Sequence, residues 1–243
     1  MRRFFWLLAA AYAGLSQPTS QPAFEVASVK PSPPPSGDAL YINLGAENHG
    51  TVRMTNVTLS ECILWAYDLV SAEQVSGPVW ISDRAVRFDI VAKASPETPS
   101  NQLRAMMQTL LAERLGLKLH SEPRRMEHLE LGVGKTGAKL EKSADGPPAF
   151  TFEYRRGRLA YSHMTTHTLA VLLARQLKQM VLDNTLLPGF YDVKLDWTPD
   201  DEGVAGVDIF SAVRQQLGLN LEVKRTPVDV FIVDGAEKTP SEN

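Results

Sequence analysis

Apolar residues recur at the three- and four-residue spacing of an amphipathic helix in two distant stretches of the chain. Each stripe begins just after a threonine, Thr58 in the first stretch and Thr165 in the second. Thr58 and Glu61 also have the spacing of a capping box, in which a hydroxyl and a carboxylate satisfy unpaired amides at a helix start. We therefore predict two helices that begin at these threonines. Their apolar stripes are Leu59, Cys62, Ile63 and Ala66, and Leu169, Leu172, Leu173, Leu177 and Met180.

Two further segments, residues 88–94 and 191–197, both open with an aromatic residue, an aspartate and a β-branched residue. Both then alternate well enough between apolar and polar positions to predict strands. A third apolar stripe, within residues 103–115, predicts another helix. Gly116 and Gly218 each stand between two leucines, and each is predicted to end a helix and release an alternating strand.

These landmarks recur in the same order at nearly equal intervals. Phe88 to Leu115 is 27 residues, and Tyr191 to Leu217 is 26 residues. We therefore predict an internal duplication, with each unit ordered strand-helix-strand-helix-strand-strand. Short turns between the closing strands favour antiparallel pairing, so the predicted fold class is α+β with largely antiparallel sheets.

The predicted organisation along the chain has five segments. Residues 1–16 form a signal peptide, and residues 17–50 hold an N-terminal strand and a proline-rich stretch. The first α+β unit covers residues 51–140. A linker at 141–149, within a connecting stretch from Gly134 to Pro148 that is rich in glycine and lysine, leads to the second unit at 150–243.

The start of the chain has the three-part pattern of a secretory signal peptide. Arg2 and Arg3 precede an apolar run of about a dozen residues, which small residues follow, and cleavage is expected after Ala13 or Ser16. The alternative is an uncleaved membrane anchor, but the run is shorter than the roughly 20 residues that span a bilayer. We expect an exported protein, either periplasmic or extracellular, without a membrane span after cleavage.

Composition narrows the possible partners. Without Arg2 and Arg3 the chain has 23 basic and 28 acidic residues, a formal net charge of −5, from 25 and 28 in the full sequence. A mildly acidic chain without a large basic cluster is not expected to bind nucleic acid. The single cysteine, Cys62, cannot form an internal disulfide and is predicted to be a small core residue.

No complete catalytic or cofactor motif is present in the sequence. Residues 132–136 resemble part of a phosphate-binding loop, but Leu129 stands where the full pattern needs a glycine. There is no Gly-x-Ser-x-Gly nucleophile motif. We therefore assign no catalytic residue, no cofactor and no metal ligand, and we expect a protein that is not an enzyme.

The alternative interpretation is an exported metal-assisted hydrolase, in which histidines would bind the metal. His120 and His128 lie on predicted strands, whereas His163 and His167 straddle a predicted helix start. None of these pairs has a recognised metal-ligand spacing, so surface or capping histidines are the favoured interpretation.

Aromatic residues recur close to the helix and strand landmarks. Core packing explains such residues by default, and an aromatic-lined groove between the two units is the functional alternative. The binding candidates are Trp65, Tyr67, Trp80, His163, His167, Tyr191 and Trp197.

Several of these segments also carry a family resemblance. They are residues 24–31 (FEVASVKP), 56–59 (NVTL), 88–93 (FDIVAK), 110–117 (LLAERLGL) and 240–243 (PSEN). In this order they resemble a large soil-associated bacterial family of exported proteins of unknown function. The resemblance implies no catalytic residues. In some members the domain is joined to a membrane metallopeptidase of the antibiotic-sensor type, which implies a sensor or accessory role for a membrane partner.

The leading hypothesis is an exported, non-catalytic binding or interaction module, with its ligand or protein partner in the cell envelope. Duplicated units create a cleft where their faces meet, so the ligand is expected between the two units. The hydrolase and the sensor or accessory domain remain the alternatives.

Overall fold

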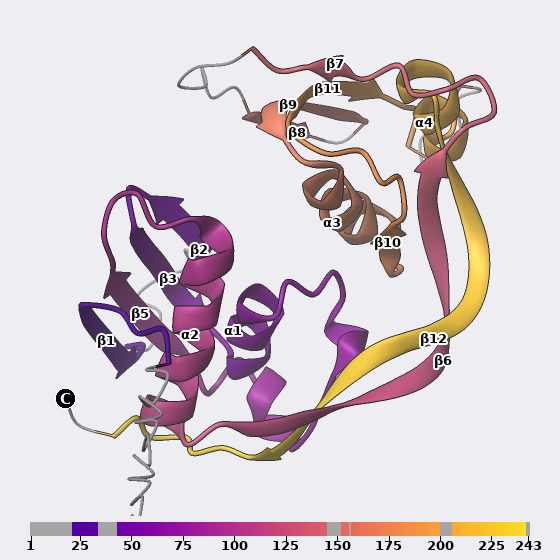
Figure 1. The fold of residues 1–243 in the computed structure, drawn as a ribbon. Coiled ribbons are helices and arrows are strands. Elements are labelled where there is room, and N and C mark those ends of the chain that lie inside the picture. The colour runs from indigo at the N-terminus through magenta and orange to yellow at the C-terminus, as the bar shows by residue number, and fades with distance from the viewer. Residues whose placement is uncertain (1–20, 34–42, 145–151, 156, 200–205, 242–243) are drawn as a thin grey trace, which may run out of the picture.

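A computed structural model describes residues 21–33, 43–144, 152–155, 157–199 and 206–241. The predicted signal peptide lies outside these residues. The described chain forms two halves of mixed helix and strand at opposite ends of a long two-stranded ribbon (Figure 1). The fold is α+β with largely antiparallel sheets, as the sequence predicts.

The first half contains a four-stranded antiparallel sheet in the order β1-β5-β3-β2. Two helices cover this sheet, and a hydrophobic core fills the space between sheet and helices. The strands are β1 (Val26–Pro31), β2 (Asn43–Asn48), β3 (Thr51–Val57) and β5 (Phe88–Lys93), and the helices are α1 (Leu59–Ala66) and α2 (Ser100–Leu115).

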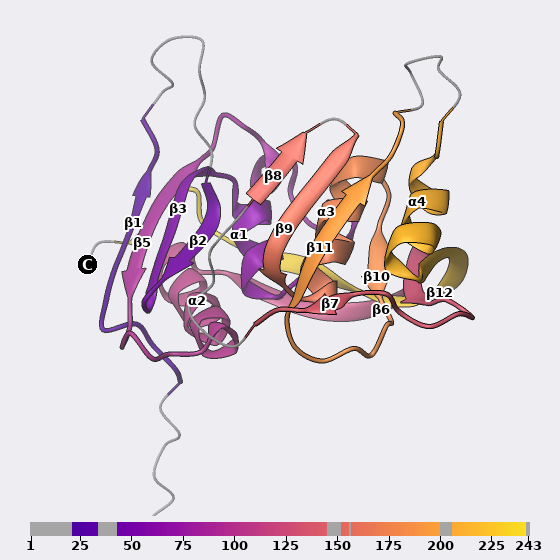
Figure 2. The same ribbon diagram turned by 90° about the horizontal axis from the view of Figure 1, so that it is seen from above.

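The second half contains a sheet in the order β7-β11-β9-β8, again antiparallel and again covered by two helices over a separate core. The β2 edge of the first sheet is turned toward the β8 edge of the second (Figure 2). The strands are β7 (Glu141–Lys142), β8 (Phe152–Arg155), β9 (Arg158–Met164) and β11 (Tyr191–Asp196), and the helices are α3 (Thr166–Leu177) and α4 (Ile209–Leu217).

A third sheet, in the order β10-β6-β12-β4, joins the halves. Its centre is the antiparallel ribbon of β6 (Lys118–Val133) and β12 (Leu219–Gly235). Each half adds a short parallel strand to the ribbon strand of the other: β4 (Val75–Ser76) pairs with β12, and β10 (Val181–Asp183) pairs with β6. Two short 3₁₀ helices flank β4, η1 (Ala72–Gln74) and η2 (Val79–Ser82).

The ribbon corrects the prediction that each unit closes with two short strands. Each half ends instead in one continuous strand, and the two strands pair with each other from Lys118 to Val133. The short turn expected between the closing strands does not interrupt this segment, although Pro123 lies there. Proline is tolerated in a strand where its missing N–H faces an open edge. At Pro123 and at Pro227 the sheet is only two strands wide, so such an edge is available.

The local signals at the helix ends are confirmed. Thr58 forms the capping box with Glu61, and the Thr165 side chain accepts a hydrogen bond from the amide of Thr168. Gly116 and Gly218 end α2 and α4 in the left-handed conformation, with φ values of 56° and 63°. Left-handed backbone is accessible to glycine because it lacks a Cβ atom.

The two halves share one order of elements. Hairpin, helix, short strand, strand, helix and ribbon strand follow one another in both, and a further strand, β1 or β7, pairs with β5 or β11. Common origin by duplication stays a prediction, which this equal order supports.

Two of the predicted segments, residues 17–50 and 141–149, contribute strands to the sheets. From the stretch 17–50, β1 and β2 complete the first sheet. At the start of the stretch predicted as a linker, β7 pairs with β11, while residues 145–149 lie outside the described residues. In the second unit, β8 and β9 form an antiparallel pair.

Candidate functional site

A cleft of about 380 Å³ lies between the two halves, where α1 approaches α3. This volume falls within the range of small-molecule sites, roughly 300–1,000 Å³. The first half contributes residues of α1, the loop after it and α2, and the second half contributes residues of α3. The α3 residues are His167, Thr168, Val171 and Arg175.

The wall formed by α1 follows from its helical period. Glu61, Leu64, Trp65 and Asp68 are three or four residues apart, so they lie along one side of the helix and its C-terminal extension. The opposite side carries the apolar stripe that packs into the core, including Cys62, which is fully buried. Burial raises the pKa of the Cys62 thiol, so this residue is an inert core side chain.

Trp65 forms the aromatic part of this wall, and two neighbours fix its position. The guanidinium of Arg104, from α2, lies 5.6 Å from the centroid of the indole ring. This distance allows a cation–π interaction. On another side Gly45 of β2 approaches the ring so closely that a Cβ atom there would lie 2.5 Å from the indole Nε1.

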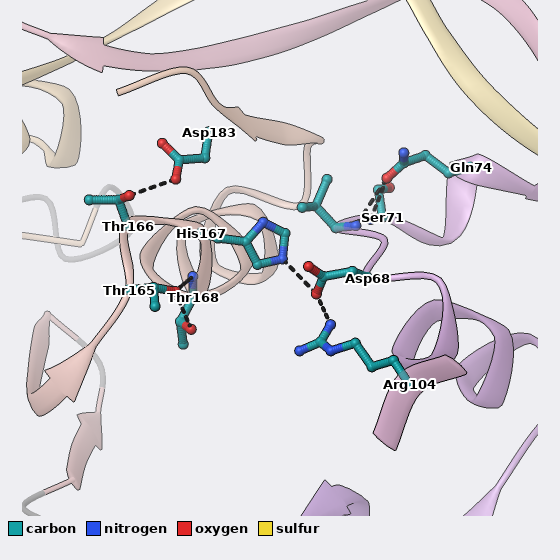
Figure 3. A network of polar contacts seen from close by, with 10 residues as sticks. Asp68, Ser71, Gln74, Arg104, Thr165, Thr166, His167, Thr168 and Asp183 are labelled. Carbon is teal, nitrogen blue, oxygen red and sulfur yellow. Dashed lines mark hydrogen bonds and ion pairs between the residues drawn. The ribbon is translucent and has the colours of Figure 1, made fainter. Parts of the chain in front are cut away.

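Asp68 links the two halves across the cleft. Its carboxylate accepts a hydrogen bond from Nη1 of Arg104 and lies 3.1 Å from Nε2 of His167 (Figure 3). Arg104 and Asp68 belong to the first half, whereas His167 is in the first turn of α3. The backbone of Asp68 is left-handed, with φ of 55°, and directs the chain away from the end of α1.

The environment of His167 favours its neutral form. Burial lowers the pKa of His167 below its usual range, the positive charge of Arg104 lowers it further, and Asp183 opposes both effects. A neutral imidazole can donate from Nε2 to the carboxylate of Asp68. His167 is therefore expected to be an uncharged polar group of the cleft at neutral pH.

Hydroxyl groups hold the start of α3 in place next to His167. Thr166 donates to Asp183 of β10 at 2.6 Å, and Thr185 donates to the same carboxylate at 2.8 Å. The Oγ1 atoms of Thr185 and Thr166 lie 3.0 Å apart, so the Thr185 proton is shared between Asp183 and Thr166, and both threonines are buried. This network ties the helix start to the ribbon sheet, so the position of His167 is set by its own half.

The charges of the cleft are balanced except at one position. Glu61 forms a two-point contact with Arg84, with distances of 2.7 and 3.2 Å. Asp68 is paired with Arg104. Arg175, in the last turn of α3, is exposed and has no partner among the residues that the structure describes.

Comparison with known proteins places this architecture in a family. The model of the family "Protein of unknown function (DUF3738)" matches residues 60–236. The chain belongs to the DUF3738 family. The match begins in α1 and ends just after β12, so it includes the cleft and the ribbon. No curated protein and no solved structure matches the chain. The predicted resemblance to a family of unknown function is thereby confirmed, whereas soil association and export stay predictions.

Two of the predicted binding candidates lie in the cleft of this DUF3738 chain, namely Trp65 and His167. Tyr67, two residues after Trp65, instead packs against Phe231 of the ribbon, with ring centroids 4.9 Å apart and the ring planes tilted by 47°. Trp80 lies near the ammonium of Lys238, which is 5.8 Å from its ring centroid.

The remaining candidates lie in the second half, outside the cleft lining. His163 stacks on Phe190, with centroids 4.0 Å apart. Tyr191 is buried and donates from its hydroxyl to the carbonyl of Pro188 at 3.0 Å. Trp197 is buried in the second core.

The histidines weighed as metal ligands belong to separate environments. His120 is exposed on the ribbon, where Asp234 and Glu122 contact it. His128 is buried, with Nδ1 3.2 Å from the carbonyl oxygen of Met126, so the surface interpretation is wrong for this residue. Across the described ranges, no three His, Cys, Asp or Glu side chains gather as a metal site. None of the described helices is long and apolar enough to cross a membrane.

Among the charged residues of the cleft, sequence reasoning missed Asp68, Arg104 and Arg175 as parts of a site. Asp68 could have been found, because it lies one helical step beyond Trp65 on the same side. Arg175 could have been found too, because it lies about two turns after His167 on the same side of α3. Arg104 had no such signal, since only the packing of α2 brings it to Trp65.

Proposed function

We propose that the protein is an exported, non-catalytic binding module that takes a small ligand into the cleft between its halves. The observation that carries this proposal is the shared lining of the cleft. An aromatic wall at Trp65 and a polar wall at His167 come from different halves, and one contact through Asp68 joins them. Sites of this kind commonly lie between packed units and combine apolar walls with a few polar groups.

Binding is favoured over hydrolysis because the hydroxyl group of Thr168 in the cleft is already hydrogen-bonded. His167 beside Asp68 resembles a general base with an orienting carboxylate, which would need a nucleophile within hydrogen-bond reach. Among the lining residues the hydroxyl belongs to Thr168, and it is engaged with Thr165 at 3.0 Å in the cap of α3.

A fragment screen with a cleft-filling variant tests the proposal. Ala72 lines the cleft and is exposed, so Ala72→Trp fills the space without disturbing a core. We expect fragments that bind the unmodified protein, detected by ligand-observed NMR, to lose binding in this variant. Ala85→Trp, at an exposed alanine outside the cleft lining, is the matched control. A fragment set that binds both variants equally, or no binding at all, would refute the proposal.

Export is the second part of the proposal, and it rests on the pattern of residues 1–16. Expression of the full chain in a Gram-negative host is expected to yield a periplasmic protein that begins just after Ala13 or Ser16. Mass spectrometry of the intact protein gives the new N-terminus. A cytoplasmic protein that retains Met1 or Arg2 would contradict export.

A further inference from the structure

We infer that the ligand of the cleft carries an anionic group beside a flat apolar part, with Arg175 binding the anion and Trp65 contacting the apolar part. This inference rests on the proposed function and adds the chemical class of the ligand.

Charge complementarity carries the first step. Of the four formally charged residues that line the cleft, three already face an opposite charge. Glu61 is held by Arg84, and Asp68 and Arg104 hold each other. Among the residues that the structure describes, none carries a charge that pairs with the positive charge of Arg175. A guanidinium recognises a carboxylate or phosphate through two parallel N–H donors, so an anion on the ligand completes this site.

The apolar lining carries the second step. Leu64 and Trp65 of α1 and Val171 of α3 come from opposite sides of the same cleft. Val171 and Arg175 are one helical turn apart on α3, so the apolar and the cationic parts of that wall are adjacent. A ligand that fits both parts has its anionic group about one helical turn away from its apolar group.

The contacts of the Asp68 carboxylate show how the cleft binds an anionic group. The carboxylate of Asp68 is half-exposed and interacts with a guanidinium and an imidazole at once. His167 can donate to an acceptor while remaining uncharged. Donors from both halves thus already hold the carboxylate of Asp68, and Arg175 on α3 is the further donor that a ligand anion can reach.

Three indole compounds of nearly equal shape test the inference directly. They are indole-3-acetate, which is an anion, indole-3-acetamide, which is neutral, and tryptamine, which is a cation. Binding is measured by calorimetry and located by the shift of the Trp65 indole N–H signal, which is assigned by its loss in Trp65→Phe. We expect the anion to bind roughly tenfold more tightly than the amide, as a charge-assisted pair with Arg does, and tryptamine to bind more weakly than both.

Two arginine variants test whether Arg175 causes the preference for the anion over the amide. Arg175→Gln is expected to remove the difference between the anion and the amide. Arg214→Gln, at the exposed arginine in the last turn of α4, is the matched control and should retain it. Thermal melts of both variants confirm that each is folded.

Each outcome separates this inference from the proposed function. Equal binding of the three compounds, a preference for tryptamine, an anion preference that survives Arg175→Gln, or no binding of indole-3-acetate overturns the inference. If fragments of other charge are still displaced by Ala72→Trp, the proposed function stands. If no fragment binds the cleft, both are overturned.

Discussion

The backbone N–H of His163 donates to Oδ1 of Asp192 at 2.9 Å, and in the first half the N–H of Asn56 donates to Oδ1 of Asp89 at the same distance. His163 and Asn56 both have left-handed backbone, with φ of 58° and 56°. A serine hydroxyl donates to each aspartate at 2.5 Å. The aspartate that follows the aromatic residue in each half thus holds an irregular strand end, which explains why this pair of residues recurs in the sequence.

Asp89→Ala is expected to destabilise the protein by about 1–3 kcal/mol, because a partly buried amide loses its acceptor. Urea denaturation followed by circular dichroism measures the change. The matched control is Asp229→Ala, at an exposed ribbon position, with an expected change of less than about 0.5 kcal/mol. Equal effects of the two substitutions would show that the hydrogen bonds of Asp89 contribute nothing.

Gly45→Ala is expected to displace Trp65 and to weaken binding in the cleft. The added Cβ atom would overlap the indole ring, and the φ of +118° is unfavourable for alanine. Overpacking costs about 1–3 kcal/mol in addition to the backbone strain. Gly137→Ala isolates the strain alone, since its φ is +83° and no atom lies within 4 Å of the added carbon. Tryptophan fluorescence and thermal melts should change more for Gly45→Ala than for Gly137→Ala.

His167 is expected to make the protein less stable in mild acid. Its pKa is lowered in the folded state, so below the ordinary value of 6.5 the unfolded chain binds the proton more readily. Stability is therefore lost as the pH falls below about 6.5, and His167→Gln should flatten this part of the profile. The measurement is urea denaturation between pH 5 and 8, with His49→Gln, at an exposed histidine outside the cleft, as the control. An unchanged profile in His167→Gln would contradict the assignment.

His120 is expected to affect the pH dependence of stability in the opposite direction to His167. Hydrogen bonds to Asp234 and then to Glu122 raise its pKa above the ordinary value. Its contribution is fully present below the unfolded pKa of 6.5 and is lost as the pH rises through the folded pKa. The group is exposed, so the effect is small and weakens with salt. NMR titration of the His120 ring should give a pKa that falls toward the ordinary value in Asp234→Asn; a pKa that does not move would rule out this pair.

Much of the local structure could be predicted because its causes are local. A threonine or a glycine at a helix end acts through its own backbone and its nearest neighbours, and Thr58, Thr165, Gly116 and Gly218 were all assigned correctly. The long ribbon could not be predicted in this way. Pro123 is a turn signal in isolation, and only the pairing with a strand about 100 residues later keeps that segment extended.

The sequence by itself determined the two sets of matching elements, the helix ends, and the presence of Trp65 and His167 on two equivalent helices, Trp65 in the last turn of the first and His167 in the first turn of the second. Only the tertiary structure decided that these two residues face one cleft, that Asp68 joins the halves, and that Arg104 reaches Trp65 from another helix. The physical reason is the range of the interactions. Capping and periodicity act over one or two helical turns, whereas the cleft depends on how the β6–β12 ribbon sets one half against the other.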